Sequence, residues 1–155
     1  MYDRRINELV NAYCRLRDRQ YAVYSRCAKQ HRLTVNELFV LDILWFAPQG
    51  CTQKEICQRL SAKKQTIAAI ACRLLKKGYL VFEEVPEDRR NKCLRLTESG
   101  KLYAQEIIPS AADAENRAME GLGITDADEI VRLTTRFTEN MENEFSYMMR
   151  EFKQD

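Results

Sequence analysis

Apolar residues recur at helical spacing between residues 63 and 77. Four of them stand at positions i, i+3, i+4 and i+7, namely Ile67, Ile70, Ala71 and Leu74. This spacing predicts a helix with one buried face. At about 100° per residue, the opposite face carries small or polar side chains, namely Gln65, Ala69, Cys72 and Lys76, flanked by Ala68 and Arg73. Gly78 ends the helix, because glycine readily adopts the left-handed conformation at that position.

Two short runs rich in β-branched and aromatic residues follow the glycine. They read YLVFEEV at 79–85 and CLRLT at 93–97, and they predict the two strands of a hairpin. The tip between them, residues 86–92, carries the cationic side chains Arg89, Arg90 and Lys92. A helix with a polar, cationic outer face followed by such a hairpin suits duplex DNA. The helix fits the major groove, and the hairpin can reach phosphates or the minor groove.

Two capping boxes fix the starts of two helices that precede this unit. Thr34 with Glu37 opens a very apolar helix, and Thr52 with Glu55 opens a short one. In such a box the hydroxyl of the first residue and the carboxylate of the fourth bind backbone N–H groups that are otherwise unpaired. The short helix and the helix over 63–77 therefore make a helix-turn-helix, and the hairpin makes the unit winged.

Long helical patterns lie on both sides of the winged unit. Residues 4–30 keep apolar positions near helical spacing, and Thr97 begins a further helix that Pro109 breaks or kinks. A last helix is predicted from a cap at Thr125 to about Phe152. One face of it carries a long apolar stripe: Ile130, Leu133, Phe137, Met141, Phe145, Met148 and Met149. Since the small winged unit offers little surface to cover this stripe, we expect an intertwined dimer interface.

The predicted fold is therefore mainly α with a small β-hairpin, an α+β arrangement. A winged helix-turn-helix is flanked in it by N- and C-terminal dimerisation helices. We expect residues 33–97 to form the DNA-binding region, and residues 1–32 and 98–155 to form the dimerisation region of the same intertwined domain. A chain of 155 residues is long enough for one such domain.

Charge is unevenly distributed along the chain. Residues 1–50 hold 8 basic and 5 acidic side chains, residues 51–101 hold 12 and 6, and residues 102–155 hold 5 and 12. The net charge of the whole chain is only +2. Positive charge is thus concentrated in the segment expected to meet DNA, as phosphate neutralisation and counterion release require.

Other classes of function find little support in the sequence. The six cysteines stand singly, and His31 has no cysteine partner at a metal-ligand spacing, so we expect no metal site. No glycine-rich phosphate loop or nucleophile elbow occurs, so we expect neither an enzyme nor a cofactor. No apolar run approaches the ~20 residues that span a bilayer, and the N-terminus lacks the apolar core of a signal peptide. We therefore expect a cytoplasmic protein that does not bind membranes.

Residues 30–101 resemble the MarR family of bacterial transcription regulators. The resemblance rests on CTQKEICQRL, on KKQTIAAIACRLLKKGYL and on EDRRNKCLRLTESGK, where Asp88-Arg89-Arg90 looks like the family's D-x-R wing motif. It implies a homodimer whose two recognition helices enter successive major grooves of a palindromic site. It also implies that Arg90 reaches the minor groove and that Asp88 orients it, which a charge-assisted hydrogen bond would allow.

The sequence departs from the family pattern at Ala68 and Ala69, where the family often carries serine and arginine. These alanines cannot hydrogen-bond to bases, although their methyl groups can contact thymine methyls. We then expect base reading mainly from Lys64, Gln65, Thr66 and Arg73, and phosphate contacts from Lys63, Lys76 and Lys77. In the wing we expect DNA contacts from Asp88, Arg89, Arg90 and Lys92.

Two kinds of sensor stay open. The resemblance implies a small, often phenolic or anionic effector. Candidate cleft residues on the first helix are Tyr13, Arg17, Tyr21 and Tyr24, with core or interface packing as the alternative. The other sensor is thiol oxidation, for which Cys14 and Cys72 are candidates because each lies beside an arginine in the sequence.

We therefore expect a sequence-specific DNA-binding repressor that acts as a homodimer and is relieved by a small ligand or by thiol oxidation. The competing function is a winged-helix module that binds proteins and no longer binds DNA. The alanines at 68 and 69 favour that alternative, whereas the positive central segment and the arginines of the wing count against it.

Overall fold

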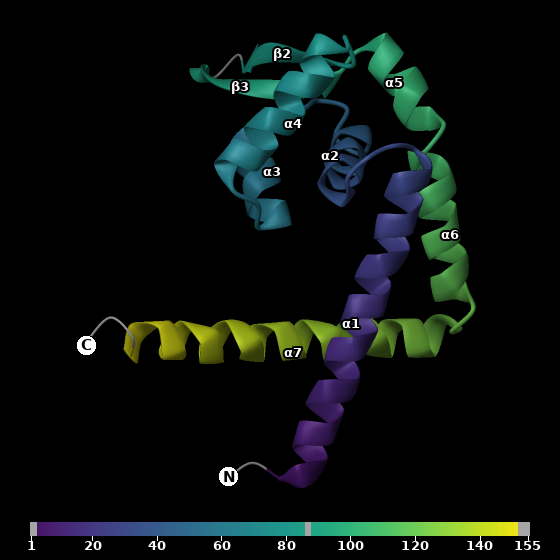
Figure 1. Cartoon of the computed structure of the whole chain (residues 1–155), viewed down its shortest axis with the longest axis vertical. Coiled ribbons are helices and arrows are strands. Elements are labelled where there is room, and N and C mark those ends of the chain that lie inside the picture. The colour runs from purple at the N-terminus through teal and green to yellow at the C-terminus, as the bar shows by residue number, and fades with distance from the viewer. Residues whose placement is uncertain (1–2, 86–87, 152–155) are drawn as a thin grey trace. The chain divides into compact units, whose positions relative to one another are not determined.

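A computed structural model describes residues 3–85 and 88–151, and of residues 84, 85, 88–91 and 151 it describes the backbone alone. The chain divides into two compact units, residues 1–111 and 112–155. Its elements are α1 (Arg4–Gln30), α2 (Val35–Trp45), β1 (Cys51–Thr52), α3 (Gln53–Leu60), α4 (Lys64–Lys76), β2 (Leu80–Val85), β3 (Asp88–Leu96), α5 (Glu98–Gln105), α6 (Ile108–Glu120) and α7 (Ile124–Glu151) (Figure 1). The prediction of a mainly helical fold with a small sheet is confirmed.

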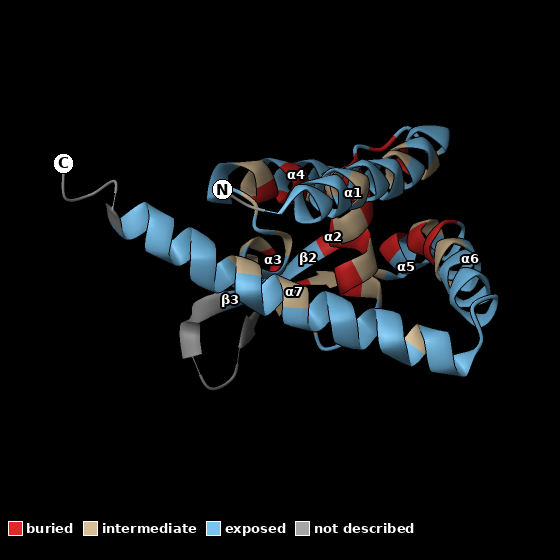
Figure 2. Ribbon diagram, turned by 90° about the horizontal axis from the view of Figure 1, so that it is seen from below, coloured by how far each residue is buried: buried red, intermediate tan, exposed pale blue. Residues whose placement is uncertain are grey.

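The core of the first unit lies where α2, α3, α4, α5 and the sheet meet. Its largest fully buried side chains are aliphatic: Val40, Leu41, Leu44, Ile56, Ile67, Leu74, Leu94 and Ile108. In Figure 2 the buried positions gather on α2 and along one side each of α4 and α5. The predicted apolar stripe of α4 is confirmed, since all four of its members are buried. Burial of this face fixes which side of α4 remains free for a partner.

Both predicted capping boxes are present. At α2 the backbone N–H of Thr34 donates to Glu37 Oε2 at 2.8 Å, and the N–H of Glu37 donates to Thr34 Oγ1 at 3.2 Å. At α3 the N–H of Thr52 donates to Glu55 Oε2 at 2.7 Å, and the N–H of Glu55 donates to Thr52 Oγ1 at 3.2 Å. These reciprocal bonds begin each helix at the residue expected from the sequence.

The ends of α3 and α4 use the left-handed conformation. Gly78 has φ +73°, and its N–H donates to Leu75 O while the N–H of Tyr79 donates to Leu74 O, both at 2.9 Å. This pair of bonds forms a Schellman motif, and the predicted end of the helix at Gly78 is confirmed. After α3 the corresponding position is Ser61, with φ +48°, which is a costlier conformation for a residue with a Cβ.

The sheet is antiparallel and three-stranded, in the order β1-β3-β2. Strand β1 was not predicted, because its two residues are too short to show an alternating pattern. Strand β3 begins at Asp88, so the predicted tip over 86–92 was too long. The β2–β3 register pairs Leu80 with Leu96 and Phe82 with Leu94, and it shifts between Glu84 and Val85.

The helices after the wing follow the predicted pattern with two corrections. The break falls after α5, and Pro109 lies in the first turn of α6, where its missing N–H would have no helical partner in any case. Helix α7 begins at Ile124, so the prediction of a cap at Thr125 was wrong. Gly123 precedes the helix instead, and its carbonyl accepts from the N–H of Ala127 at 3.0 Å. Phe152 lies outside the described residues.

Every residue of α7 over 124–150 is exposed or half-buried (Figure 2). This includes the predicted apolar stripe, of which Phe137 and Met141 are half-buried. Within the second unit a hollow of about 480 Å³ opens between α6 and α7, lined by Met119, Ile130, Val131, Thr134, Thr135, Thr138 and Glu139. None of the described helices is long and apolar enough to cross a membrane.

Candidate nucleic-acid interface

The face of α4 opposite its buried stripe is open to solvent. Its exposed members are Gln65, Ala69, Cys72 and Lys76, while the neighbouring Thr66 and Ala68 are half-buried. Helix α4 itself packs against α2, α3 and β2, and it lies beside the β2–β3 hairpin (Figure 1). Of the residues expected to read bases, Gln65 is centred on this free surface, whereas Lys64 and Thr66 lie about 100° to either side of it around the helix, and Thr66 is partly covered.

The start of α4 is suited to an anion. Lys63 occupies the N-cap position, and within the part of the chain that the structure describes its side chain makes no capping hydrogen bond. The first N–H groups of a helix lack helical partners and carry the positive end of its dipole. With Lys63 and Lys64 both exposed, this end of the helix can receive a phosphate group.

Arg73 has a partner inside the protein. Its Nε lies 3.3 Å from Oε1 of Glu37, the capping residue of α2, whose side chain is almost fully buried. The sequence did not reveal this pair, because the two residues lie on different helices and Glu37 was already assigned to its capping box. Arg73 is about half exposed, so it stands at the edge of the free surface and not at its centre.

The wing is described only in part. The backbone of β3 includes Asp88, Arg89 and Arg90, but the structure does not describe their side chains. Their expected DNA contacts therefore stay predictions. Lys92 is exposed, and its Cα lies opposite that of Glu84 in the register of β2 and β3. Closer to the core, Arg95 on β3 forms an ion pair with Glu83 on β2, which joins the two strands near the base of the hairpin.

Two exposed cations on α3 were not among the predicted contacts. Lys54 and Arg59 lie on the first helix of the helix-turn-helix. In this motif the first helix crosses the DNA backbone, so cations on it are suited to phosphates. The sequence did contain a signal for these two contacts, since both cations lie on a capped helix directly before α4.

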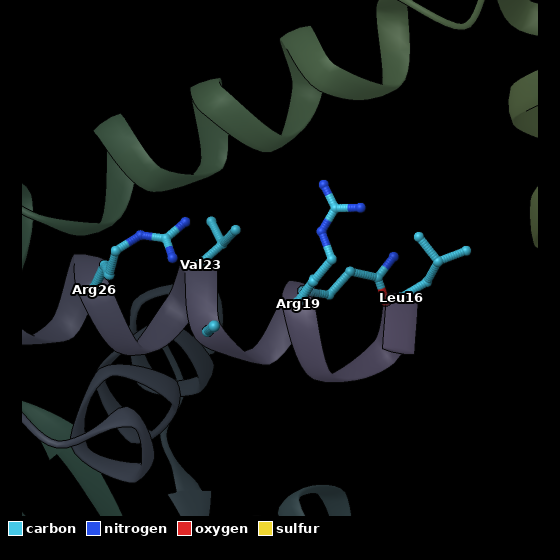
Figure 3. A pocket seen from close by; sticks show the side chains of 6 residues that line it. Leu16, Arg19, Val23 and Arg26 are labelled. Carbon is cyan, nitrogen blue, oxygen red and sulfur yellow. The ribbon is translucent and has the colours of Figure 1, made fainter. Parts of the chain in front are cut away.

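The four candidate cleft residues on α1 have different surroundings. Tyr24 packs edge-to-face on Phe39 of α2, with ring centroids 5.2 Å apart, and Arg17 pairs with Asp18 at 2.9 Å. Tyr13 and Tyr21 are exposed. A hollow of about 300 Å³ lies along the same stretch of α1 but is lined by other side chains, namely Leu16, Arg19, Gln20, Ala22, Val23 and Arg26 (Figure 3). None of the four predicted residues lines this hollow.

All six cysteines are free thiols. Cys72 is exposed on α4 and Cys14 is half-buried on α1. Burial, with a hydrogen bond to Glu55, raises the pKa of the Cys51 thiol to about 11, so Cys51 stays protonated at neutral pH. Among the described residues no group of three or more His, Cys, Asp or Glu side chains could hold a metal ion.

Comparison with known proteins bears on this site. A family model described as "MarR family" matches residues 16–91. The chain is 31% identical over 109 residues to the uncharacterized HTH-type transcriptional regulator YkoM of Bacillus subtilis (strain 168), covering 70% of each chain. It superposes with a TM-score of 0.72 on NMB1585, a MarR family regulator from Neisseria meningitidis, at 27% identity over 92% of this chain and 94% of that one. The S. aureus MepR–DNA complex gives a TM-score of 0.68 at 19% identity, covering 83% of this chain and 97% of MepR, which shows a shared fold.

Proposed function

We propose, from the premise that this chain belongs to the MarR family of transcriptional regulators, that it binds double-stranded DNA through α4 and the wing. One observation carries the proposal: the surface of α4 opposite the core exposes Gln65 and Lys76, and Lys64 is exposed in the first turn of the helix. Lys63 stands at the start of the same helix. Such a surface matches the major groove, where amide and cationic side chains read base edges and phosphates. MepR, which shares the fold, has been crystallised with DNA.

A salt series on random duplex DNA tests the proposal. For each phosphate contact, the logarithm of the binding constant should fall with the logarithm of salt concentration by a slope of about 0.9. The double substitution Lys63→Met and Lys64→Met should reduce the slope by about 2 if both contact phosphates. A matched control is Arg4→Met, which removes an exposed cation that pairs with Glu8 on α1. Affinity that does not change with salt would favour the protein-interaction module instead.

The regulator is proposed to act as a homodimer on a palindromic operator. The apolar stripe of α7 supports this, since large side chains such as Leu133 and Phe145 are about half exposed in the single chain. Sequences selected from a random pool should form a palindrome with half-sites about one helical turn apart. Repression is the expected outcome, because a dimer seated on an operator blocks other proteins from that DNA.

Light scattering on the purified protein tests the dimer. Phe145→Glu places a charge in the stripe and should shift the mass from dimer to monomer. Ser146→Glu adds the same charge to the opposite face of α7 and should leave the mass unchanged. A parent protein that is monomeric at all concentrations would contradict the proposed dimer.

Relief of DNA binding is proposed to come from a small ligand or from thiol oxidation. Cys72 supports the second route, because its exposed thiol lies on the surface of α4 that would face DNA. Oxidation there would add bulk or negative charge against the phosphates. Peroxide should then weaken DNA binding by the parent but not by Cys72→Ser. Equal loss in both proteins would exclude Cys72 and leave Cys14 or an effector.

We propose that the regulator acts in the cytoplasm. Its effector would be a small anionic or phenolic molecule. The hollow on α1 supports an anion, because Arg19 and Arg26 lie on either side of the apolar Val23, with Leu16 beyond Arg19 (Figure 3). Benzoate is a simple probe of this chemistry. It should weaken DNA binding by the parent and have less effect on Arg26→Met, whereas an equal effect on both would exclude this hollow.

A further inference from the structure

A buried carboxylate joins α4 to the start of α2. Glu37 is only 3% exposed. Its Oε2 accepts hydrogen bonds from the N–H and the hydroxyl of Thr34, at 2.8 and 2.9 Å, and its Oε1 lies 3.3 Å from Nε of Arg73. One oxygen therefore serves the cap of α2, and the other serves a side chain of α4.

Arg73 lies at the border of the surface that would face DNA. At about 100° per residue it is displaced by about 80° around α4 from Gln65, toward the buried Ile70. Its Nε lies within ion-pair distance of Glu37, while Gln65 and Ala69 stand nearer the centre of the exposed face. Arg73 is thus poorly placed to reach into a groove and well placed to link two helices.

The ion pair is strongly constrained by burial. A carboxylate withheld from water needs a charged or hydrogen-bonding partner for each oxygen, and removing one partner leaves an uncompensated charge. Helix α2 also packs against α5, where burial, followed by Tyr79 and the charge of Glu37, raises the pKa of Tyr103. Tyr103 stacks on Tyr79, directly beyond α4, with ring centroids 4.4 Å apart. Arg73 therefore connects α4 to a buried group at the start of α2.

We propose that Arg73 is a positioning residue, which acts through Glu37 to fix the direction in which Gln65 and its neighbours face the DNA groove. The inference rests on the proposed DNA binding. It assigns to Arg73 a role different from the base contact that the sequence led us to expect. It also makes the start of α2 a place from which displacement would reach the DNA-binding surface.

A double-mutant cycle tests this role. The four proteins are the parent, Arg73→Met, Glu37→Gln and the double variant, and each is titrated with the selected duplex over a salt series. We expect either single substitution to weaken binding by about tenfold with an unchanged salt slope. The double variant should lose little more than either single variant, because both remove the same contact. Glu37 is buried and cannot contact DNA itself, so its effect must be indirect.

Lys63→Met is the matched control for a direct phosphate contact. It should lower the salt slope by about 0.9 in the presence or absence of the ion pair. The inference is overturned if Arg73→Met lowers the slope in the same way, or if its loss of affinity is as large in the Glu37→Gln background as in the parent. A parent that shows no salt-dependent affinity would instead overturn the proposed function, and this inference with it.

Folding is checked separately by circular dichroism and urea unfolding of each variant. Glu37→Gln keeps a capping side chain, since glutamine can replace glutamate in a capping box. If Arg73→Met does not fold, Glu37→Gln alone decides the question: a folded Glu37→Gln protein with the affinity of the parent overturns the inference.

Discussion

The hydroxyl of Thr97 donates a hydrogen bond to the carbonyl oxygen of Gly78 at 2.6 Å, which joins the turn after α4 to the residue before α5. The hydroxyl of Ser99 donates to the same carbonyl at 3.1 Å, and the N–H of Thr97 donates to Tyr79 O at 3.0 Å. The segment that follows the wing is therefore hydrogen-bonded to the segment that precedes it. The two ends of the wing cannot separate without breaking these bonds.

The backbone of Tyr79 lies so close to Gly100 that no side chain fits there. A Cβ at Gly100 would stand 2.0 Å from the carbonyl oxygen of Tyr79, which is backbone and cannot rotate away. We expect Gly100→Ala to lower the free energy of unfolding by at least about 2 kcal/mol, measured by urea denaturation. Gly121→Ala is the control, because a Cβ there would lie 3.4 Å from Arg117 O. A loss at Gly100 no larger than at Gly121 would contradict the geometry.

The turn between α3 and α4 can be improved. Ser61 has φ +48°, a conformation that costs a residue with a Cβ about 1–2 kcal/mol, whereas glycine adopts it freely. Glycine also gains entropy in the unfolded chain, so the net gain in unfolding free energy for Ser61→Gly should be about 0.5–1 kcal/mol. Ser61→Ala keeps the Cβ and should show no gain in the same urea titration.

The local features of this fold are visible in the sequence, and the contacts between distant segments are not. The pairs Thr34 with Glu37 and Thr52 with Glu55 act over one helical turn, so the sequence predicts both helix starts. The short β1 and the ion pair of Arg73 with Glu37 depend on how separate segments are folded together. Composition and spacing carry no signal for such pairs.

The candidate site divides in the same way. Helical spacing predicts that Gln65 and Ala69 share an exposed face, because periodicity determines which side of a helix is buried. The same reasoning placed Arg73 among the base contacts, because it considers one helix alone. The hollow beside Arg26 on α1 also escaped prediction, since the sequence pattern drew attention to the tyrosines of that helix.

The capping box of α3 makes stability depend on pH. Hydrogen bonds from the N–H and hydroxyl of Thr52 lower the pKa of Glu55 below its ordinary value of 4.5. A lowered folded pKa contributes stability that is present above 4.5 and is lost as the pH falls through the folded value. Glu55→Gln keeps a capping side chain without this titration, so the parent should be the more stable protein at about pH 7. Its advantage should shrink toward about pH 3 in thermal unfolding, whereas a difference that stays constant with pH would contradict this origin.

Gln65 is expected to supply sequence preference and not general affinity. A glutamine side chain can pair with both N6 and N7 of adenine in the major groove, and the alanine methyl at 69 can contact a thymine methyl. We expect Gln65→Ala to weaken binding to the selected operator by about 1–3 kcal/mol and to relax the preference at one position of each half-site. The salt slope should stay unchanged, because no phosphate contact is lost. Gln105→Ala removes an exposed glutamine from α5 and should leave the selected sequence unaltered. If Gln65→Ala weakened binding to all sequences equally, Gln65 would be a backbone contact.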